Sequence, residues 1–243
     1  MGASQALALE KLLAGQGFAR KPDGALLTGL GAKLARASEL PAARRRQDAS
    51  LLELLVGRNG FVELSARRSS GRFSIALQAL AAATSAGEAA ALVDLGDHLD
   101  PQGAESAGVD LARLLWVRPH RAKEAVAAAE MLLSAGFPLV VADFGLSPRG
   151  ARFLPDAAWV RLGRAAEARS ATLLLATPWR LSGVAVRTAV SASCAQPLWQ
   201  GSSRAPRLLS GLSSRLTLEK DARARSGLFE TLSLSMAGAF AGR

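Results

Sequence analysis

The sequence of 243 residues has little of what builds disulfide-linked, zinc-binding or membrane proteins. Its single cysteine, Cys194, excludes an internal disulfide framework and a zinc site made from cysteines. No apolar run approaches the roughly 20 residues that a membrane-spanning helix needs. No secretory signal is visible, because Glu10 and Lys11 interrupt the first apolar run. We therefore expect a cytoplasmic protein that makes no contact with a membrane.

Acidic residues are also scarce, and this sets the expected class of partner. The chain has 20 Asp and Glu against 30 Lys and Arg, which gives a formal net charge of +10. A hydrophobic content of 49% is sufficient for a globular core, although only 5% of the residues are aromatic. The excess positive charge makes nucleic acid the first partner to consider. An arginine-rich surface without a specific role would give the same charge.

Apolar patterning alternates between strand and helix through the middle of the chain, which predicts an α/β protein with a mostly parallel twisted sheet flanked by helices. The expected strands are 61–65, 89–93, 114–117, 138–142 and 172–176, and the expected helices are 51–55, 74–86, 121–135 and 157–169. In such sheets ligands bind at the carboxyl ends of the strands. Ser65, Asp94, Asp143 and Thr177 are expected there.

Segments outside this pattern divide the chain further. We expect residues 1–45 to form a small helical extension and basic linker, residues 46–236 the core domain, and residues 237–243 a tail. Residues 215–236 predict a closing hairpin. The alternative is a terminal helix that docks on a partner through one apolar face. That face would consist of Leu228, Leu232, Met236 and Phe240.

The turn ARRSSGR, between the first strand and the helix that follows it, occupies the place of a phosphate-binding loop. A working loop reads G-x-x-x-x-G-K-[ST], because backbone N–H groups, a lysine and a metal-binding hydroxyl must converge on the phosphates. Here Ala66 replaces the first glycine, Arg72 the lysine and Phe73 the hydroxyl residue, while Ser70 and Gly71 fit the pattern. The sequence thus predicts the scaffold of such a loop without its chemistry.

An acid-free window follows the last expected parallel strand. Between Glu167 and Glu219 the chain has no acidic residue and six arginines. Trp179 and Trp199 are the aromatic residues among them, and aromatics among arginines suit stacking on single-stranded bases. Packing of both tryptophans in the core is the alternative. The candidate DNA-binding residues are Arg67, Arg68, Arg72, Trp179, Arg180, Arg187, Arg204 and Arg207.

At these positions the sequence resembles the RecA family of recombinases. SSGRFS matches the SSGKTT segment of the RecA phosphate loop, and residues 94–115 resemble RecA's D-A-E-H-A-L-D-P...LGVD...LL run. Leu139–Asp143 matches the strand and aspartate of the Walker B element. Residues 172–176 match the strand before RecA's second DNA-binding loop, so the acid-free window is expected to be the counterpart of that loop. The resemblance covers residues 50–177.

The resemblance implies an ATP site, and the departures from it imply that this site is inactive. The glutamate that activates the attacking water in RecA-like enzymes corresponds to Gly96, and Asp97 lies on the wrong side of the chain to replace it. We expect no catalytic residue, no cofactor and no metal, and we expect Asp143 to form a structural ion pair with an arginine. His98 and His120 lack metal-ligand spacing and are expected to have surface or loop roles.

A RecA-type core with a degenerate nucleotide site is similar to the ImuA family of RecA relatives. That resemblance implies a non-catalytic adaptor of the SOS response, associated with the nucleoid, that supports translesion synthesis. Its implied partners are DNA (single-stranded), RecA, an ImuB-like polymerase homologue and an error-prone polymerase. Two alternatives remain open: an ATP-binding recombination mediator that uses Arg72 and Asp97, and a SulA-like cell-division inhibitor that acts through protein contact.

Overall fold

The structure is a computed structural model that describes residues 51–57, 60–67, 70–148, 150–201, 207–221 and 226–235. The expected extension at residues 1–45 and the expected tail at residues 237–243 lie outside the described residues, as do Arg68 and Arg204. No helix in the described part of the chain is long and apolar enough to cross a membrane.

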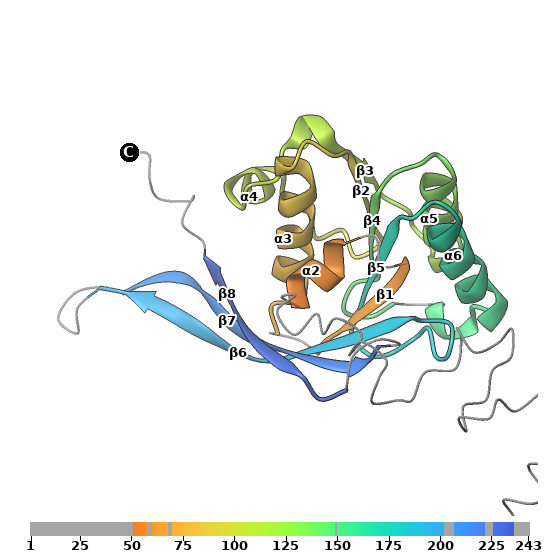
Figure 1. The fold of residues 1–243 in the computed structure, drawn as a ribbon. Helices are drawn as coiled ribbons and strands as arrows, with labels where there is room; N and C mark the ends of the chain where they lie inside the picture. Colours follow the sequence, from red (N-terminus) through yellow and green to blue (C-terminus); the bar gives the residue numbers. More distant parts are fainter. Residues whose placement is uncertain are drawn as a thin grey trace, which may run out of the picture. The chain divides into compact units, whose positions relative to one another are not determined.

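Helices and strands alternate along most of the described chain (Figure 1). The α-helices are α2 (Leu51–Val56), α3 (Arg72–Ser85), α4 (Pro101–Ser106), α5 (Ala122–Ser134) and α6 (Asp156–Ala168). The strands are β1 (Gly60–Ser65), β2 (Ala90–Asp94), β3 (Leu114–Val117), β4 (Leu139–Asp143), β5 (Thr172–Thr177), β6 (Thr188–Gln200), β7 (Leu208–Lys220) and β8 (Phe229–Ser235). Short 3₁₀ turns are η1 (Leu111–Arg113) and η2 (Ala151–Phe153).

The described strands form one sheet in the order β3-β2-β4-β5-β1-β6-β7-β8. The first six in this order are parallel, whereas β7 is antiparallel to β6 and β8 to β7. Helix α3 lies on one face of the sheet, and α5 and α6 lie on the other (Figure 1). This arrangement confirms the predicted α/β class and the mostly parallel sheet.

Burial on both faces explains why the central strands β1, β2, β4 and β5 are almost continuously apolar. Within β1, Val62 and Leu64 belong to the core on the α3 side, and Phe61 belongs to the core that contains Trp159 of α6. The carboxyl ends of the strands lie in register, with Asp94 of β2 beside Asp143 of β4. The sheet thereby brings side chains that are distant in sequence to one edge.

The expectation that the acid-free window is a loop is wrong for much of its length. Only residues 178–187 connect β5 to β6, and β6 then runs for 13 residues beside β7. The physical reason is burial: Val190 and Ala192 pack in the core on the α3 side, opposite Leu216 and Leu218 of β7. A strand that buries only alternate side chains needs few large apolar residues. The serine-rich sequence of β6 therefore gave no clear strand pattern.

The closing hairpin is confirmed. Strands β7 and β8 pair antiparallel, and the Leu218 N–H donates to the Leu228 carbonyl at 2.7 Å across the turn. The alternative terminal helix is therefore wrong for Leu228 and Leu232, which lie beside and within β8. Met236 and Phe240 are outside the described residues.

Candidate functional site

Arg72 lies inside the protein, in the position that the lysine of a phosphate loop would occupy in the sequence. It is the first residue of α3 and its side chain is buried. The Nη2 atom donates to Asp143 Oδ1 at 3.2 Å, and Nη1 lies 3.5 Å from the Ala66 carbonyl oxygen. The expected ion pair between Asp143 and an arginine is therefore confirmed. Arg72 is wrong as a candidate DNA contact, because its charge faces Asp143 rather than solvent.

The other described residues of the loop also make contacts within the protein. The Ser70 hydroxyl donates to the Arg67 carbonyl at 2.6 Å, and the Ser214 hydroxyl of β7 donates to the Ser70 carbonyl at 2.7 Å. Gly71 has a φ of 77°, a left-handed conformation that favours glycine. These contacts hold the strand–turn–helix shape that the sequence predicted.

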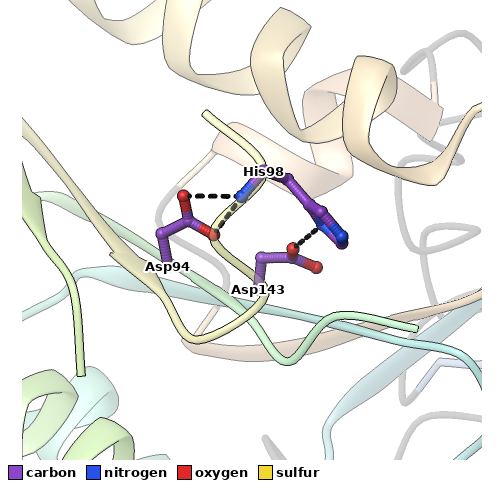
Figure 2. A group of neighbouring side chains, drawn as sticks. All are labelled: Asp94, His98 and Asp143. Atoms are coloured by element: carbon purple, nitrogen blue, oxygen red, sulfur yellow. Dashed lines mark hydrogen bonds and ion pairs between the residues drawn. The ribbon is translucent and has the colours of Figure 1, made fainter. Parts of the chain in front are cut away.

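His98 contacts the other oxygen of Asp143, with 2.7 Å between Nδ1 and Oδ2 (Figure 2). His98 lies in the loop between β2 and α4, as expected, but its side chain is only 30% exposed and its pairing with Asp143 was not predicted. The cause lies at the end of β2, where Asp94 accepts hydrogen bonds from the backbone N–H groups of His98 and Leu99. These bonds fold the chain back over the sheet edge. The His98 ring then packs edge-on against Phe73, with 5.5 Å between the ring centroids.

Asp94, His98 and Asp143 have the ligand types and spacing of a metal site, since one ligand atom from each lies within 4.8 Å of the others. Their hydrogen-bonding capacity is nevertheless used within the protein. Asp94 accepts from the two backbone groups and from Trp116 Nε1 at 3.3 Å, and Asp143 contacts His98 and Arg72. A cation at Asp143 would meet the Arg72 guanidinium at close range. The residues do not fit a bound divalent metal.

At Gly96, which the resemblance aligns with the catalytic glutamate of RecA-like enzymes, the structure leaves no room for a side chain. A Cβ atom at Gly96 would lie 2.7 Å from Asp143 Oδ2 and 2.8 Å from the Cα of Gly145. Asp97, the neighbouring carboxylate, points elsewhere and pairs with Arg118 at 2.7 Å on the surface. With Phe73 in place of the hydroxyl, these residues do not fit a magnesium–nucleotide complex.

Burial and the neighbouring Asp143 carboxylate shift the pKa values of Arg72 and His98 in this cluster. Burial lowers the pKa of the Arg72 guanidinium, and the charge and hydrogen bond of Asp143 partly offset that effect. The hydrogen bond to Asp143 raises the pKa of His98, while partial burial opposes it. Arg72 Nε has no hydrogen-bond partner within the described residues, so this arginine fits its buried position imperfectly.

A second feature is a groove of about 450 Å³ at the carboxyl ends of β1 and β5. It opens beside the turn at residues 66–72, which we call the relic loop because the sequence predicts a degenerate phosphate-binding loop there. Three of the sequence candidates line it together: Arg67, Trp179 and Arg180. Hydroxyl groups of Ser70 and of β6 serines complete the polar lining, with Glu219 as a carboxylate at one side. Trp179 is 37% exposed, so packing in the core is wrong for it, and the Arg152 guanidinium lies 5.0 Å from its ring centroid.

The remaining DNA-binding candidates lie elsewhere. Arg187 pairs with Glu167 at 3.5 Å on the surface. Arg207 is exposed and precedes β7 at the far end of the β6–β7 pair. Trp199, near that same end, is more than half exposed, so the core alternative is wrong for it as well.

Glu63 is a residue that the sequence reasoning missed. It is fully buried in β1 and accepts hydrogen bonds from Thr177 Oγ1, from the N–H of Leu181 at 2.6 Å, and from the hydroxyl of Ser182. The Arg180 Nε lies 3.9 Å from the same carboxylate. Glu63 thus holds the segment that carries Trp179 and Arg180. A lone carboxylate inside the apolar strand FVELS was the available signal.

Comparison with known proteins shows sequence similarity over part of the chain. Residues 51–150 match the family model of the RecA N-terminal domain. Protein RecA of Lactobacillus delbrueckii subsp. bulgaricus is 34% identical over 107 residues, which are 44% of this chain and 32% of that protein. Protein RecA of Corynebacterium jeikeium is 39% identical over 87 residues, which are 35% and 23%. These matches span a third or less of the relatives' length.

The fold gives a broader match than the sequence. The crystal structure of the RadB recombinase is similar with a TM-score of 0.58 at 15% identity, over 77% of this chain and 94% of that chain. At this identity the likeness concerns the fold. Residues 51–150 thus match the RecA N-terminal domain in sequence, and the chain is similar in fold to the RadB recombinase.

Proposed function

We propose that this chain is a RecA-like adaptor that does not hydrolyse ATP and that acts on DNA in the bacterial DNA-damage response. The observation that carries the proposal is the Arg72–Asp143–His98 cluster. It pairs each oxygen of Asp143, the residue that matches the Walker B aspartate, with a side chain of the protein itself, and it places the Arg72 guanidinium where a metal would bind. Phosphoryl transfer depends on charges placed around the phosphates, and here the protein's own charges neutralise one another instead.

Single-stranded DNA is the proposed ligand of the groove. Arg67 and Arg180 supply positive charge for phosphates, and Trp179 supplies a flat aromatic surface for a base. Arg152, stacked on Trp179, adds a further positive charge next to that surface. The +10 net charge of the whole chain favours the approach of a polyanion to this groove.

The partners in the pathway are a finer proposal that rests on the resemblance to the ImuA family. They are RecA, an ImuB-like polymerase homologue and an error-prone polymerase, with which the adaptor would support translesion synthesis on the cytoplasmic nucleoid. The relatives named above are RecA proteins and a RadB recombinase, which supports DNA as the shared partner of this group.

The proposal is tested by measuring ATP and DNA binding on the same full-length protein. Calorimetry with magnesium–ATP should give no binding heat, and phosphate release should equal that of a protein-free blank. Anisotropy with a labelled single-stranded oligonucleotide should show binding. Trp179→Ala should weaken it by about 1–3 kcal/mol, the usual contribution of one stacked base. Val184→Ser, a change of an exposed apolar residue in the same connection, should leave it unchanged.

Each alternative has its own outcome in these measurements. Tight magnesium-dependent ATP binding would favour the ATP-binding recombination mediator and would contradict the proposed inactive site. Absence of oligonucleotide binding even at low salt would remove DNA from the proposal. It would leave a SulA-like protein-interaction module as the better reading of this fold.

A further inference from the structure

Glu219 is the single carboxylate among the described residues that line the groove, and it is the penultimate residue of β7. It lies at a register shift in the pairing of β7 with β6, where Leu218 is opposite Val190 and Lys220 is opposite Ala189. Glu219, between them, has no partner residue on β6 and is the extra residue of a β-bulge. Bulges re-aim a side chain and are frequent beside functional sites. At this bulge the carboxylate lines the groove.

This carboxylate is free to accept hydrogen bonds from a ligand. Glu219 is exposed and forms no hydrogen bond or ion pair within the described part of the chain, although arginines line the same groove. The other acidic residues close to the groove are engaged. Glu63 is buried and accepts several hydrogen bonds, and Asp221 accepts one from the Thr188 hydroxyl at 2.6 Å.

The charges of the groove restrict the group that Glu219 can bind. A phosphate would be repelled by the carboxylate, and a basic side chain of a protein partner would be repelled by Arg67 and Arg180. A neutral group that donates hydrogen bonds meets neither repulsion. Nucleobases are such groups, and their flat faces suit stacking on Trp179, which lines the same groove.

Among the bases of DNA, guanine matches a carboxylate best. Its Watson–Crick edge carries two donors side by side, the N1–H and the N2 amino group, which can bind the two carboxylate oxygens together. Adenine and cytosine each present one donor group beside acceptors. Thymine places its single N–H between two carbonyl oxygens, which the carboxylate would repel.

We propose that Glu219 recognises guanine at one position of single-stranded DNA in the groove. The base would stack on Trp179 and donate its N1–H and an N2–H to the carboxylate, while Arg67 and Arg180 contact the flanking phosphates. This inference rests on the proposed binding of DNA by the groove. It adds a base preference, which phosphate contacts alone do not give.

The test measures the anisotropy of short labelled oligonucleotides with the full-length protein at one salt concentration. The strands are an oligothymidine and the same oligothymidine with one central guanine, adenine, cytosine or hypoxanthine. Hypoxanthine keeps the N1–H of guanine and lacks its N2 amino group. The guanine strand should bind about tenfold more tightly than the oligothymidine, and the hypoxanthine strand should lose part of this preference.

Two protein variants test the role of the carboxylate. Glu219→Gln keeps the shape of the side chain but replaces one acceptor oxygen by a donor, so the ratio of guanine-strand to oligothymidine affinity should fall close to one. Glu105→Gln removes the same charge from an exposed position on α4 and is the matched control, which should keep the ratio of the unmodified protein. Thermal unfolding should show that both variants retain the fold.

The outcomes separate this inference from the proposed function. Equal affinity for all strands would overturn guanine recognition and leave DNA binding intact, whereas binding of none of them would contradict both. A preference for adenine or cytosine, or a guanine preference that Glu219→Gln retains, would also overturn it. Unlabelled dGMP is a competitor in the same assay. Displacement of the guanine strand by an equal concentration of dGMP would indicate a site for a free nucleotide rather than for a base within a strand.

Discussion

At the scale of single residues, the exchange of lysine for Arg72 changes what the loop can do. A lysine presents a compact charge to a phosphate, whereas the planar guanidinium of arginine is suited to pairing with a carboxylate. In this chain the carboxylate is Asp143 of its own sheet. Both side chains of the pair are buried. Loss of one partner would therefore leave the other as an uncompensated buried charge.

Removal of the charge on Asp143 should destabilise the fold strongly. Asp143→Asn leaves the Arg72 guanidinium buried without a counter-charge, for which the expected cost is about 3–5 kcal/mol of unfolding free energy. In urea denaturation this loss of unfolding free energy should appear as a lower midpoint concentration, with an unchanged slope of free energy against urea. The matched control is Asp97→Asn, which breaks an exposed pair with Arg118 and should cost less than about 1 kcal/mol. Equal costs for the two variants would contradict the structural role of the buried pair.

His98 should make stability depend on pH near neutrality. Its pKa is raised in the folded state, mainly by the hydrogen bond to Asp143, above an unfolded value of about 6.5. A group of this kind contributes stability that is complete below the unfolded pKa and is lost as the pH rises through the folded pKa. Compared with His98→Asn, the unmodified protein should therefore lose unfolding free energy as the pH rises above about 6.5. Parallel pH profiles for the two proteins would contradict this.

At the scale of elements, the sequence predicted those parts whose local pattern decides their structure. Strands β2, β4 and β5 are buried on both faces and bounded by turn residues, so their positions followed from their composition. β6 was missed because its burial comes from pairing with β7, which lies later in the chain and gives no local signal.

In the candidate site, too, the sequence did not predict contacts that depend on distant segments of the chain. The ion pair at Asp143 could be predicted, because an aspartate at a strand end beside a loop arginine has few other ways to be satisfied. The contact of His98 with Asp143 could not be predicted. It depends on hydrogen bonds from backbone N–H groups to Asp94, which fold the connection between β2 and α4 back over the sheet edge. Glu63 was visible as a polar residue in an apolar strand, but its partners at residues 177–182 come from a segment more than a hundred positions away.

Glu63 gives a prediction at this scale, since one side chain fixes the whole β5–β6 connection. Glu63→Ala leaves the Leu181 N–H and the Ser182 hydroxyl buried without their acceptor, and each such loss costs about 1–3 kcal/mol. Hydrogen exchange should accelerate at residues 178–187 more than in β2 or β4. Glu63→Gln, which keeps an acceptor of similar shape, should show a smaller effect. Uniform acceleration across the sheet would mean general destabilisation rather than release of this connection.

At the scale of the whole molecule, positive charge and the RecA-like sheet serve different ends. The sheet aligns the strand ends, and the relic loop closes one part of that edge with internal ion pairs. The neighbouring groove carries the exposed Arg67 and Arg180, the second of which lies 3.9 Å from the Glu63 carboxylate. One edge of the sheet therefore holds an internally paired cluster at Asp143 and, beside it, a groove that carries exposed arginines.

This division of charge predicts how DNA binding should respond to salt. For single strands, the slope of log affinity against log salt is about −0.7 for each phosphate neutralised. Removal of Arg67 and Arg180 together, two cations of the groove, should therefore make the slope shallower by about 1.4, in addition to weakening binding. The control is Arg161→Ala, since Arg161 is engaged by Glu130 on the α5–α6 side of the sheet and should not alter the slope. Anisotropy titrations from low to moderate salt measure all three proteins. If the double variant kept the original slope, the phosphates would be neutralised by arginines outside the groove, and the DNA interface would have to be sought on another face of the molecule.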